Sequence, residues 1–170
     1  MSSEHYRAMH EGYLRELRLK YSILVKSAPA LSGAELDRIS RLPIDRDIRR
    51  EAFKLLSEIR LHEIYFSSFS DSPVIFRVRA GERTPSSAGL LYSLKCASLS
   101  LDSGFVTLRK ERGRIEIVAD RDFTAHFKGG APELAIDICE HAYFGDFGFS
   151  KSRYLEDILP KLRIDKIYAE

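Results

Sequence analysis

The most informative stretch of this sequence is Asp137-Ile138-Cys139-Glu140-His141-Ala142-Tyr143. It places an aspartate and a histidine four residues apart, directly after the short apolar run Leu134-Ala135-Ile136. Carboxylates and imidazoles both bind first-row transition metals. The stretch therefore predicts half of a metal site at the end of a strand, and the other ligands must come from elsewhere in the chain.

Two earlier segments contain candidate histidines. The first runs from His5 to Tyr13, eight residues later, and the second is His62-Glu63-Ile64-Tyr65-Phe66. An isolated histidine on an amphipathic helix is usually an ordinary surface or core residue. We expect this of His10, which faces away from the row that His5 and Tyr13 share on a helix. The registration of His5 and His62 with the later stretch favours them as ligands instead.

The three segments, in this order, resemble the iron/manganese superoxide dismutases. Those enzymes carry D-x-W-E-H-A-Y as the last motif and H-x-[LI]-[FY]-[WF] as the second. The resemblance implies one iron or manganese ion per subunit, with superoxide as substrate and Tyr13 at the substrate channel as a proton relay. Three imidazoles and one carboxylate suit such a borderline metal, whereas structural zinc prefers closed tetrahedral sites. The implied metal ligands are His5, His62, Asp137 and His141.

The residues around this implied site depart from the family pattern. Relatives use a glutamine to contact the metal-bound solvent, but this chain contains none. Glu58 stands at the iron-type position, one helical turn before His62, and His126 stands near the manganese-type region. Either side chain is a candidate for the solvent contact, and the position of Glu58 favours iron slightly. Cys139 and Phe66 replace two tryptophans of the family.

The resemblance also implies a homodimer. In relatives the glutamate of the last motif reaches across a two-fold axis to the ligand histidine of the other subunit, and Glu140 and His141 keep that pair. Met9 and Phe144 stand where relatives have a histidine and a tyrosine that bond across the same interface. Replacing both partners leaves no unpaired polar group, so we expect a retained interface with an apolar contact at this point.

Apolar spacing predicts an α+β fold. Residues 1–72 are expected to form a long N-terminal α-hairpin, and residues 73–170 a small three-stranded antiparallel sheet with flanking helices. The hairpin helices are predicted near residues 6–24 and 45–69, with a short helix at 34–41 between them. The later elements are predicted as helices at 86–99 and around 155–162, and as strands at 105–108, 115–119 and 134–136, with a turn at 111–113.

Composition limits the classes of function. The 170 residues suit one compact unit or two lobes with a shared core, and the net charge of +2 offers no global argument for nucleic acid. No apolar run reaches membrane-spanning length, and charged residues throughout positions 1–25 do not resemble a signal peptide. Cys96 and Cys139 are too few for a disulfide framework. We expect a cytoplasmic protein with no nucleic-acid or membrane partner.

Two functions follow from these observations. The leading hypothesis is a superoxide dismutase that converts superoxide to dioxygen and hydrogen peroxide. The alternative is a superoxide dismutase-like binding or structural protein, or a related redox metalloprotein without dismutase activity. The missing glutamine and the lost tryptophans motivate this alternative.

Overall fold

The computed structural model describes residues 3–70, 87–111, 114–164 and 167, without the side chains of residues 3–6, 9 and 87. The predicted boundary near residue 72 and most of the predicted turn at 111–113 lie outside these residues. Within the described part of the chain, no helix is both long and apolar enough to cross a membrane.

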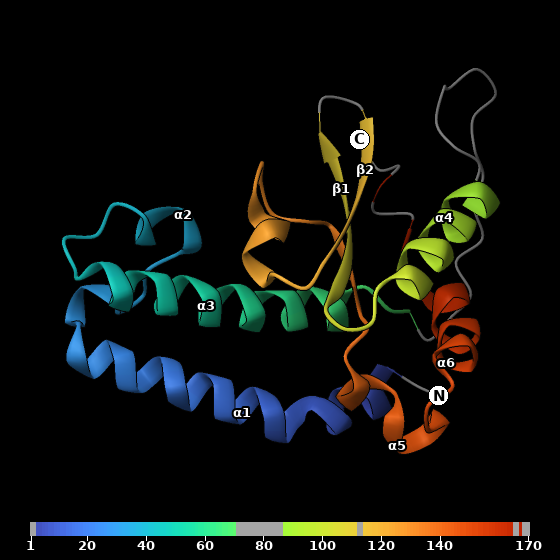
Figure 1. The fold of residues 1–170 in the computed structure, drawn as a ribbon, viewed down its shortest axis with the longest axis horizontal. Helices are drawn as coiled ribbons and strands as arrows, with labels where there is room; N and C mark the ends of the chain where they lie inside the picture. The colour runs from blue at the N-terminus through green and yellow to red at the C-terminus, as the bar shows by residue number, and fades with distance from the viewer. Residues whose placement is uncertain (1–2, 71–86, 112–113, 165–166, 168–170) are drawn as a thin grey trace.

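Two long helices form the N-terminal hairpin, as the apolar spacing predicts. Helix α1 (Ser3–Ser27) and helix α3 (Arg46–Ser67) lie side by side (Figure 1), joined through the short elements η1 (Pro29–Leu31) and α2 (Leu36–Ile39). Asp45 caps α3, because its carboxylate accepts hydrogen bonds from two backbone N–H groups of the first turn at 2.7 and 3.2 Å. This cap sets where α3 begins and therefore which of its side chains face inward.

The contact between the hairpin helices sets the rotation of α1. Leu14 and Leu17 of α1 are buried against Leu55 and Ile59 of α3. His10 lies one helical turn before Leu14, so it shares the buried face of α1 and is itself completely buried. The hairpin packing thus directs His10 into the protein interior.

A three-stranded antiparallel sheet follows, as predicted. Strands β1 (Phe105–Glu111), β2 (Arg114–Asp120) and β3 (Leu134–Asp137) are ordered β2-β1-β3, with Phe105 opposite Asp137. Helix α3 packs on β3. The last residue of β3 is therefore held close to the second helix of the hairpin.

Short helices surround the sheet and complete the α+β architecture (Figure 1). The apolar spacing predicts a helix around residues 155–162, but the α-helix in the structure ends at Ile158. Pro160 lacks a backbone N–H and cannot continue an α-helix, so the chain proceeds as a 3₁₀ turn. The flanking elements are α4 (Ser87–Ser100), η2 (Phe123–Phe127), η3 (Glu140–Ala142), α5 (Phe144–Phe147), α6 (Lys151–Ile158) and η4 (Leu159–Lys161).

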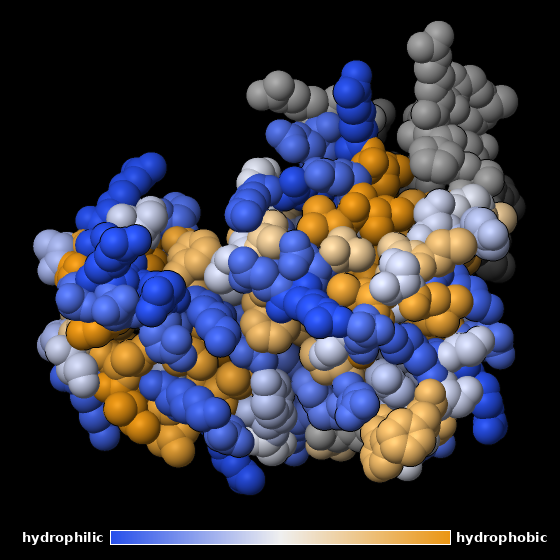
Figure 2. Space-filling view, viewed as in Figure 1, coloured by the Kyte–Doolittle hydropathy of each residue, from blue (hydrophilic) through white to orange (hydrophobic). Residues whose placement is uncertain are grey.

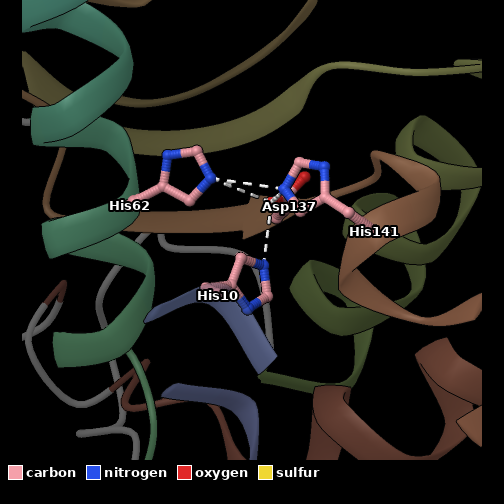
Figure 3. A group of neighbouring side chains, drawn as sticks. All are labelled: His10, His62, Asp137 and His141. Carbon is pink, nitrogen blue, oxygen red and sulfur yellow. Dashed lines mark hydrogen bonds and ion pairs between the residues drawn. The ribbon is translucent and has the colours of Figure 1, made fainter. Parts of the chain in front are cut away.

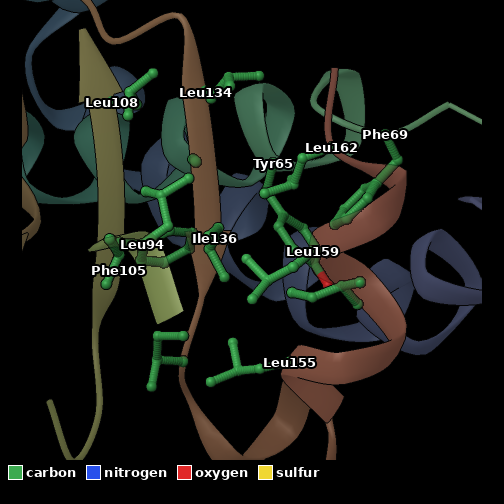
Figure 4. Packing of buried hydrophobic residues seen from close by; sticks show 14 of the residues in the cluster. Tyr65, Phe69, Leu94, Phe105, Leu108, Leu134, Ile136, Leu155, Leu159 and Leu162 are labelled. Atoms are coloured by element: carbon green, nitrogen blue, oxygen red, sulfur yellow. The ribbon is translucent and has the colours of Figure 1, made fainter. Parts of the chain in front are cut away.

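The main core lies between the sheet, the end of α3 and α6 (Figure 4). Tyr65 and Tyr154 are fully buried there, and their hydroxyl oxygens are 3.0 Å apart. The Tyr154 hydroxyl donates a hydrogen bond to the backbone carbonyl of Asp137 at 2.8 Å. The core therefore fixes the end of β3, where the decisive sequence stretch begins.

Candidate metal centre

Four side chains from four different elements meet at the end of β3 (Figure 3). They are His10 of α1, His62 of α3, Asp137 of β3 and His141 of η3. One ligand atom from each lies within 4.8 Å of all the others. The first three side chains are completely buried, and the side chain of His141 is 32% exposed. The cluster is closed on the side of the core and open only near His141.

The three imidazoles point the same nitrogen at one carboxylate oxygen. Asp137 Oδ2 lies 3.0 Å from His141 Nε2, 3.2 Å from His10 Nε2 and 3.4 Å from His62 Nε2. His62 Nε2 and His141 Nε2 are themselves 3.4 Å apart. Convergence of four donor atoms on one small volume is what binding of a single metal ion requires.

Hydrogen bonds from outside the cluster orient two of its members. His62 Nδ1 lies 2.8 Å from the backbone carbonyl oxygen of Glu58, which holds the ring with Nε2 toward the cluster. Asp137 Oδ1 accepts from the backbone N–H of Cys139 at 2.8 Å. The second carboxylate oxygen is thereby left facing the histidines.

The charges of Asp137 and His141 are coupled. Burial alone would raise the pKa of Asp137, but hydrogen bonds with His10, His141 and His62 hold it well below its usual range. Burial alone would lower the pKa of His141, but the hydrogen bond and charge of Asp137 raise it overall. A buried carboxylate that stays anionic needs positive charge beside it, from protonated imidazole or from a metal ion.

The donor set fits a first-row metal. Three imidazole nitrogens and one carboxylate oxygen match the ligand preferences of iron and manganese, and all four are held by packed elements rather than by free loops. Hence His10, His62, Asp137 and His141 are the residues that would hold such an ion.

A family model for the iron/manganese superoxide dismutases, C-terminal domain, matches residues 92–169. Residues 92–169 are thus similar to the C-terminal domain of this family. The matched region contains Asp137 and His141, while His10 and His62 come from the helical hairpin that precedes it. None of the curated proteins that were compared matches the sequence.

The structure corrects the expectation for His10, which the sequence pattern places outside the ligand set. The sequence spacing predicts His5 as the ligand on α1 and an outward His10, whereas His10 occupies the cluster. Helix α1 is rotated so that His10 faces the cluster. The side chain of His5 lies outside the described residues. The row of His10, Leu14 and Leu17 was the sequence signal for this rotation.

Tyr13 and Glu58 lie beside the cluster and contact each other. The Tyr13 hydroxyl donates a hydrogen bond to Glu58 Oε1, and the Tyr13 ring centroid lies 4.6 Å from that of His141. Burial, and then the hydrogen bond and charge of Glu58, raise the pKa of Tyr13. The Tyr13 hydroxyl therefore stays protonated, and it lies at the open side of the cluster.

His126 occupies a different place from the one that its candidate role requires. Its Nδ1 lies 2.8 Å from Thr107 Oγ1, and its Nε2 donates to the backbone carbonyl of Asp120 at 3.2 Å. The Phe105 ring contacts both the His126 ring and the His62 ring and so stands between them, with centroid distances of 6.4 and 5.2 Å. Both nitrogens of His126 therefore form hydrogen bonds with residues of the β-sheet. Of the two candidates for the solvent contact, Glu58 and His126, the structure brings only Glu58 to the cluster.

Two further residues line the site where relatives carry tryptophans. The Phe66 ring meets the His10 ring edge-on at 5.4 Å, so it retains an aromatic wall on that side. Cys139 offers no ring, and burial together with the charge of Asp137 raises the pKa of its thiol. The Cys139 side chain is thus a neutral, small group next to the carboxylate.

Proposed function

We propose that this protein is a superoxide dismutase of the iron/manganese type. The observation that carries the proposal is the convergence of His10, His62 and His141 on the buried carboxylate of Asp137, in a region similar to the C-terminal domain of the superoxide dismutases. A bound iron or manganese ion supplies the one-electron oxidation and reduction that superoxide dismutation needs. The overall reaction consumes two superoxide anions and two protons and yields dioxygen and hydrogen peroxide.

The residues of this chain support that chemistry in three ways. The anion of Asp137 offsets the positive charge of a redox ion, and burial of His10 and His62 excludes bulk water from the inner side. The partial exposure of His141 leaves one side open to a small anion. Tyr13 lies at that side with its proton directed to Glu58, where a proton is needed for release of hydrogen peroxide.

Iron is the metal that we propose, and one feature supports it. In iron-type relatives, the residue that contacts the metal-bound solvent comes from the second helix of the hairpin. Glu58 stands at this position. Glu58 contacts Tyr13 beside the cluster, whereas His126 is engaged by Thr107 and Asp120. The negative charge of Glu58 replaces a neutral amide there and favours the oxidised state of an ion.

We further propose a homodimer with the metal sites near the interface. His141 uses Nε2 toward Asp137, and its Nδ1 forms no hydrogen bond with any described residue. Glu140 is exposed beside it and would accept from Nδ1 of the partner subunit's His141. Phe144 and Phe149 are 49% and 83% exposed, and their ring centroids lie 5.0 Å apart. Figure 2 shows hydrophobic side chains gathered over α5 in this region.

A second function has one observation in its favour. Glu58 adds a carboxylate close to Tyr13 and raises the pKa of its hydroxyl, which opposes rapid proton transfer from Tyr13. This supports a redox metalloprotein that binds the same ion but does not dismute superoxide efficiently.

Decay of superoxide generated by pulse radiolysis distinguishes these functions. The full-length protein is loaded with iron or with manganese, and its metal content is measured in the same samples. A decay rate that rises in proportion to bound metal supports the dismutase. Full occupancy without faster decay than in buffer contradicts the dismutase and supports the second function.

A further inference from the structure

A second site of interest is a cavity of about 610 Å³ at the far end of α3 from the metal centre. The cavity is bounded by the end of α2, the first half of α3 and η2. In Figure 2 the surface is hollowed between the part that carries α2 and the part that carries β1 and β2. A volume of this size is typical of pockets for small molecules.

The cavity is strongly basic. Its lining contains Arg46, Arg49, Arg50 and Lys54 but only one acidic side chain, that of Asp122. The Asp122 carboxylate already accepts hydrogen bonds from the backbone N–H and hydroxyl of Thr124 at 3.0 and 2.7 Å. A cavity with this charge balance attracts anions.

Most of this positive charge is available to a ligand. Arg46 and Lys54 form no ion pair with any residue in the described part of the chain. Arg50 pairs with Asp47 at 3.2 Å, but both side chains are about four-fifths exposed, at 80% and 78%. Exposed pairs of this kind are weak and exchange readily for a better-placed anion.

Arg49 lines this cavity and has one donor without a partner. Its Nη2 donates to the backbone carbonyls of Leu42 and Ile44, at 2.9 Å in each case, which holds the guanidinium in place. Its Nε is buried and has no hydrogen-bond partner. A buried charged donor without an acceptor is costly, and an oxygen of a bound anion would satisfy it.

One aromatic ring shares the cavity with these cations. Phe53 lies one helical turn after Arg49 and is only partly buried, with its inner side packed on the small core of the hairpin. A half-exposed ring next to arginines offers a stacking surface for a planar group. Phosphate charge and a flat base therefore suit neighbouring parts of the same cavity.

We propose that this cavity binds a nucleotide, with its phosphates on the arginines and Lys54 and its base on Phe53. Arginine forks match phosphate oxygens in pairs, and the ring accounts for selectivity over an inorganic polyphosphate. The concave shape and the limited volume favour a single nucleotide over a nucleic-acid strand, which needs an extended basic track. Arg49 and His62 are separated by about 20 Å along α3, so this site is independent of the metal centre.

Isothermal titration calorimetry of the full-length protein tests the proposal with three probes: ATP, tripolyphosphate and adenosine. We expect ATP to bind about tenfold more tightly than tripolyphosphate, and adenosine to bind weakly, because both the phosphates and the base contribute. Metal content is measured before and after titration, so that removal of metal by ATP is not counted as binding.

Matched variants locate the binding. Arg46→Glu with Lys54→Glu should weaken ATP at least about tenfold, since two exposed cations without partners become anions. Arg15→Glu with Arg153→Glu makes the same change in net charge at exposed positions elsewhere and should leave ATP affinity within about twofold. Phe53→Leu keeps the apolar packing and should remove the preference for ATP over tripolyphosphate.

Three results would overturn the proposal. The first is no heat of binding with ATP at about 1 mM, the weak limit for such a ligand. The second is equal weakening by the two charge-reversal pairs, which would indicate non-specific attraction. The third is tighter binding of a short single-stranded RNA than of ATP, which would assign the cavity to a nucleic-acid surface instead.

Discussion

His10 Nε2 lies 3.2 Å from Asp137 Oδ2, although 127 residues separate them in the chain. The first residue comes from the helical hairpin, and the second from the end of a strand in the region that matches the family model. Both side chains are fully buried, so the contact exists only when the two parts of the chain are packed together. Metal binding and the packing of the hairpin on this region are therefore one linked equilibrium.

Replacement of His10 should remove the metal. His10→Ala deletes one of four converging donors, and we expect metal content after purification to fall by at least about tenfold. His5→Ala should leave it unchanged, because the four converging donors all remain in that variant. Elemental analysis of the two variants, expressed with added iron or manganese, measures this. Loss of metal in His5→Ala with retention in His10→Ala would mean that α1 is rotated from the position described.

The effect of pH on stability should depend on the metal. The folded-state pKa of His141 is raised, so its contribution is complete below the unfolded value of about 6.5 and is lost as pH rises through the folded value. Metal-free protein should thus lose stability over a pH range that begins at about 6.5, the unfolded value, and extends above it. A bound metal needs neutral imidazole, so the stabilisation by metal should grow over the same range.

Urea unfolding at pH values across this range measures both effects. His141→Gln lacks the titrating group, and subtracting its pH dependence removes the contribution of other residues. Asp137 does not interfere, because its lowered pKa places the loss of its contribution at acidic pH. A metal-free wild-type protein that gains stability with pH relative to His141→Gln would disprove the coupling of His141 to Asp137.

Neutralising Glu58 should lower the pKa of the Tyr13 hydroxyl beside the site. Glu58→Gln removes the charge and the strong acceptor that help to raise the pKa of Tyr13, so this pKa should fall toward its ordinary value of about 10. Ultraviolet titration, as the difference from Tyr13→Phe, isolates the hydroxyl. Glu63→Gln, which neutralises a partly exposed glutamate on the same helix, should leave the titration unchanged.

His126 offers a further control for this experiment. His126→Gln should leave the Tyr13 titration unchanged, because Phe105 separates it from the cluster. The variant should instead lose about 1–3 kcal/mol of stability, since Thr107 and the Asp120 carbonyl lose a well-placed buried partner. A shift of the Tyr13 pKa in His126→Gln but not in Glu58→Gln would reverse our assignment.

The two exposed phenylalanines test the proposed dimer. Phe144→Ser with Phe149→Ser should raise the dimer dissociation constant at least about tenfold, because a large apolar surface is removed from the interface. Glu140→Ala should weaken both assembly and metal retention. Analytical ultracentrifugation measures the dissociation constant. A wild-type protein that sediments as a monomer with a fully occupied metal site would refute the dimer, whatever the variants do.

Much of the fold was predictable, because the spacing of apolar residues and the order of the predicted elements along the chain indicate it. Alternating strands around residues 105–119 and helical spacing before residue 69 predict the α+β architecture, and the structure confirms it. Asp137 and His141 were also accessible, because their spacing is local and they adjoin a short apolar strand. Local patterns of this kind depend little on how distant segments pack.

The rotation of α1 was harder to predict, for a physical reason. Tyr13 and Leu14 are adjacent apolar residues near the wide stripe of this helix, so the apolar pattern admits more than one inward direction. The buried pair of Leu14 and Leu17 against α3 selects one of them and brings His10 to the site. Likewise, only the register of the sheet shows that Phe105 separates His126 from the site.

X-ray absorption at the metal edge tests the central claim most directly, namely that His10, His62, Asp137 and His141 bind one ion. The iron-loaded protein should contain about one ion per chain, with scattering from three imidazoles and one carboxylate at about 2.0–2.2 Å. His10→Ala, examined at whatever occupancy it retains, should show one imidazole fewer. An unchanged imidazole count in His10→Ala, or two imidazoles or fewer in the loaded wild-type protein, would contradict the account.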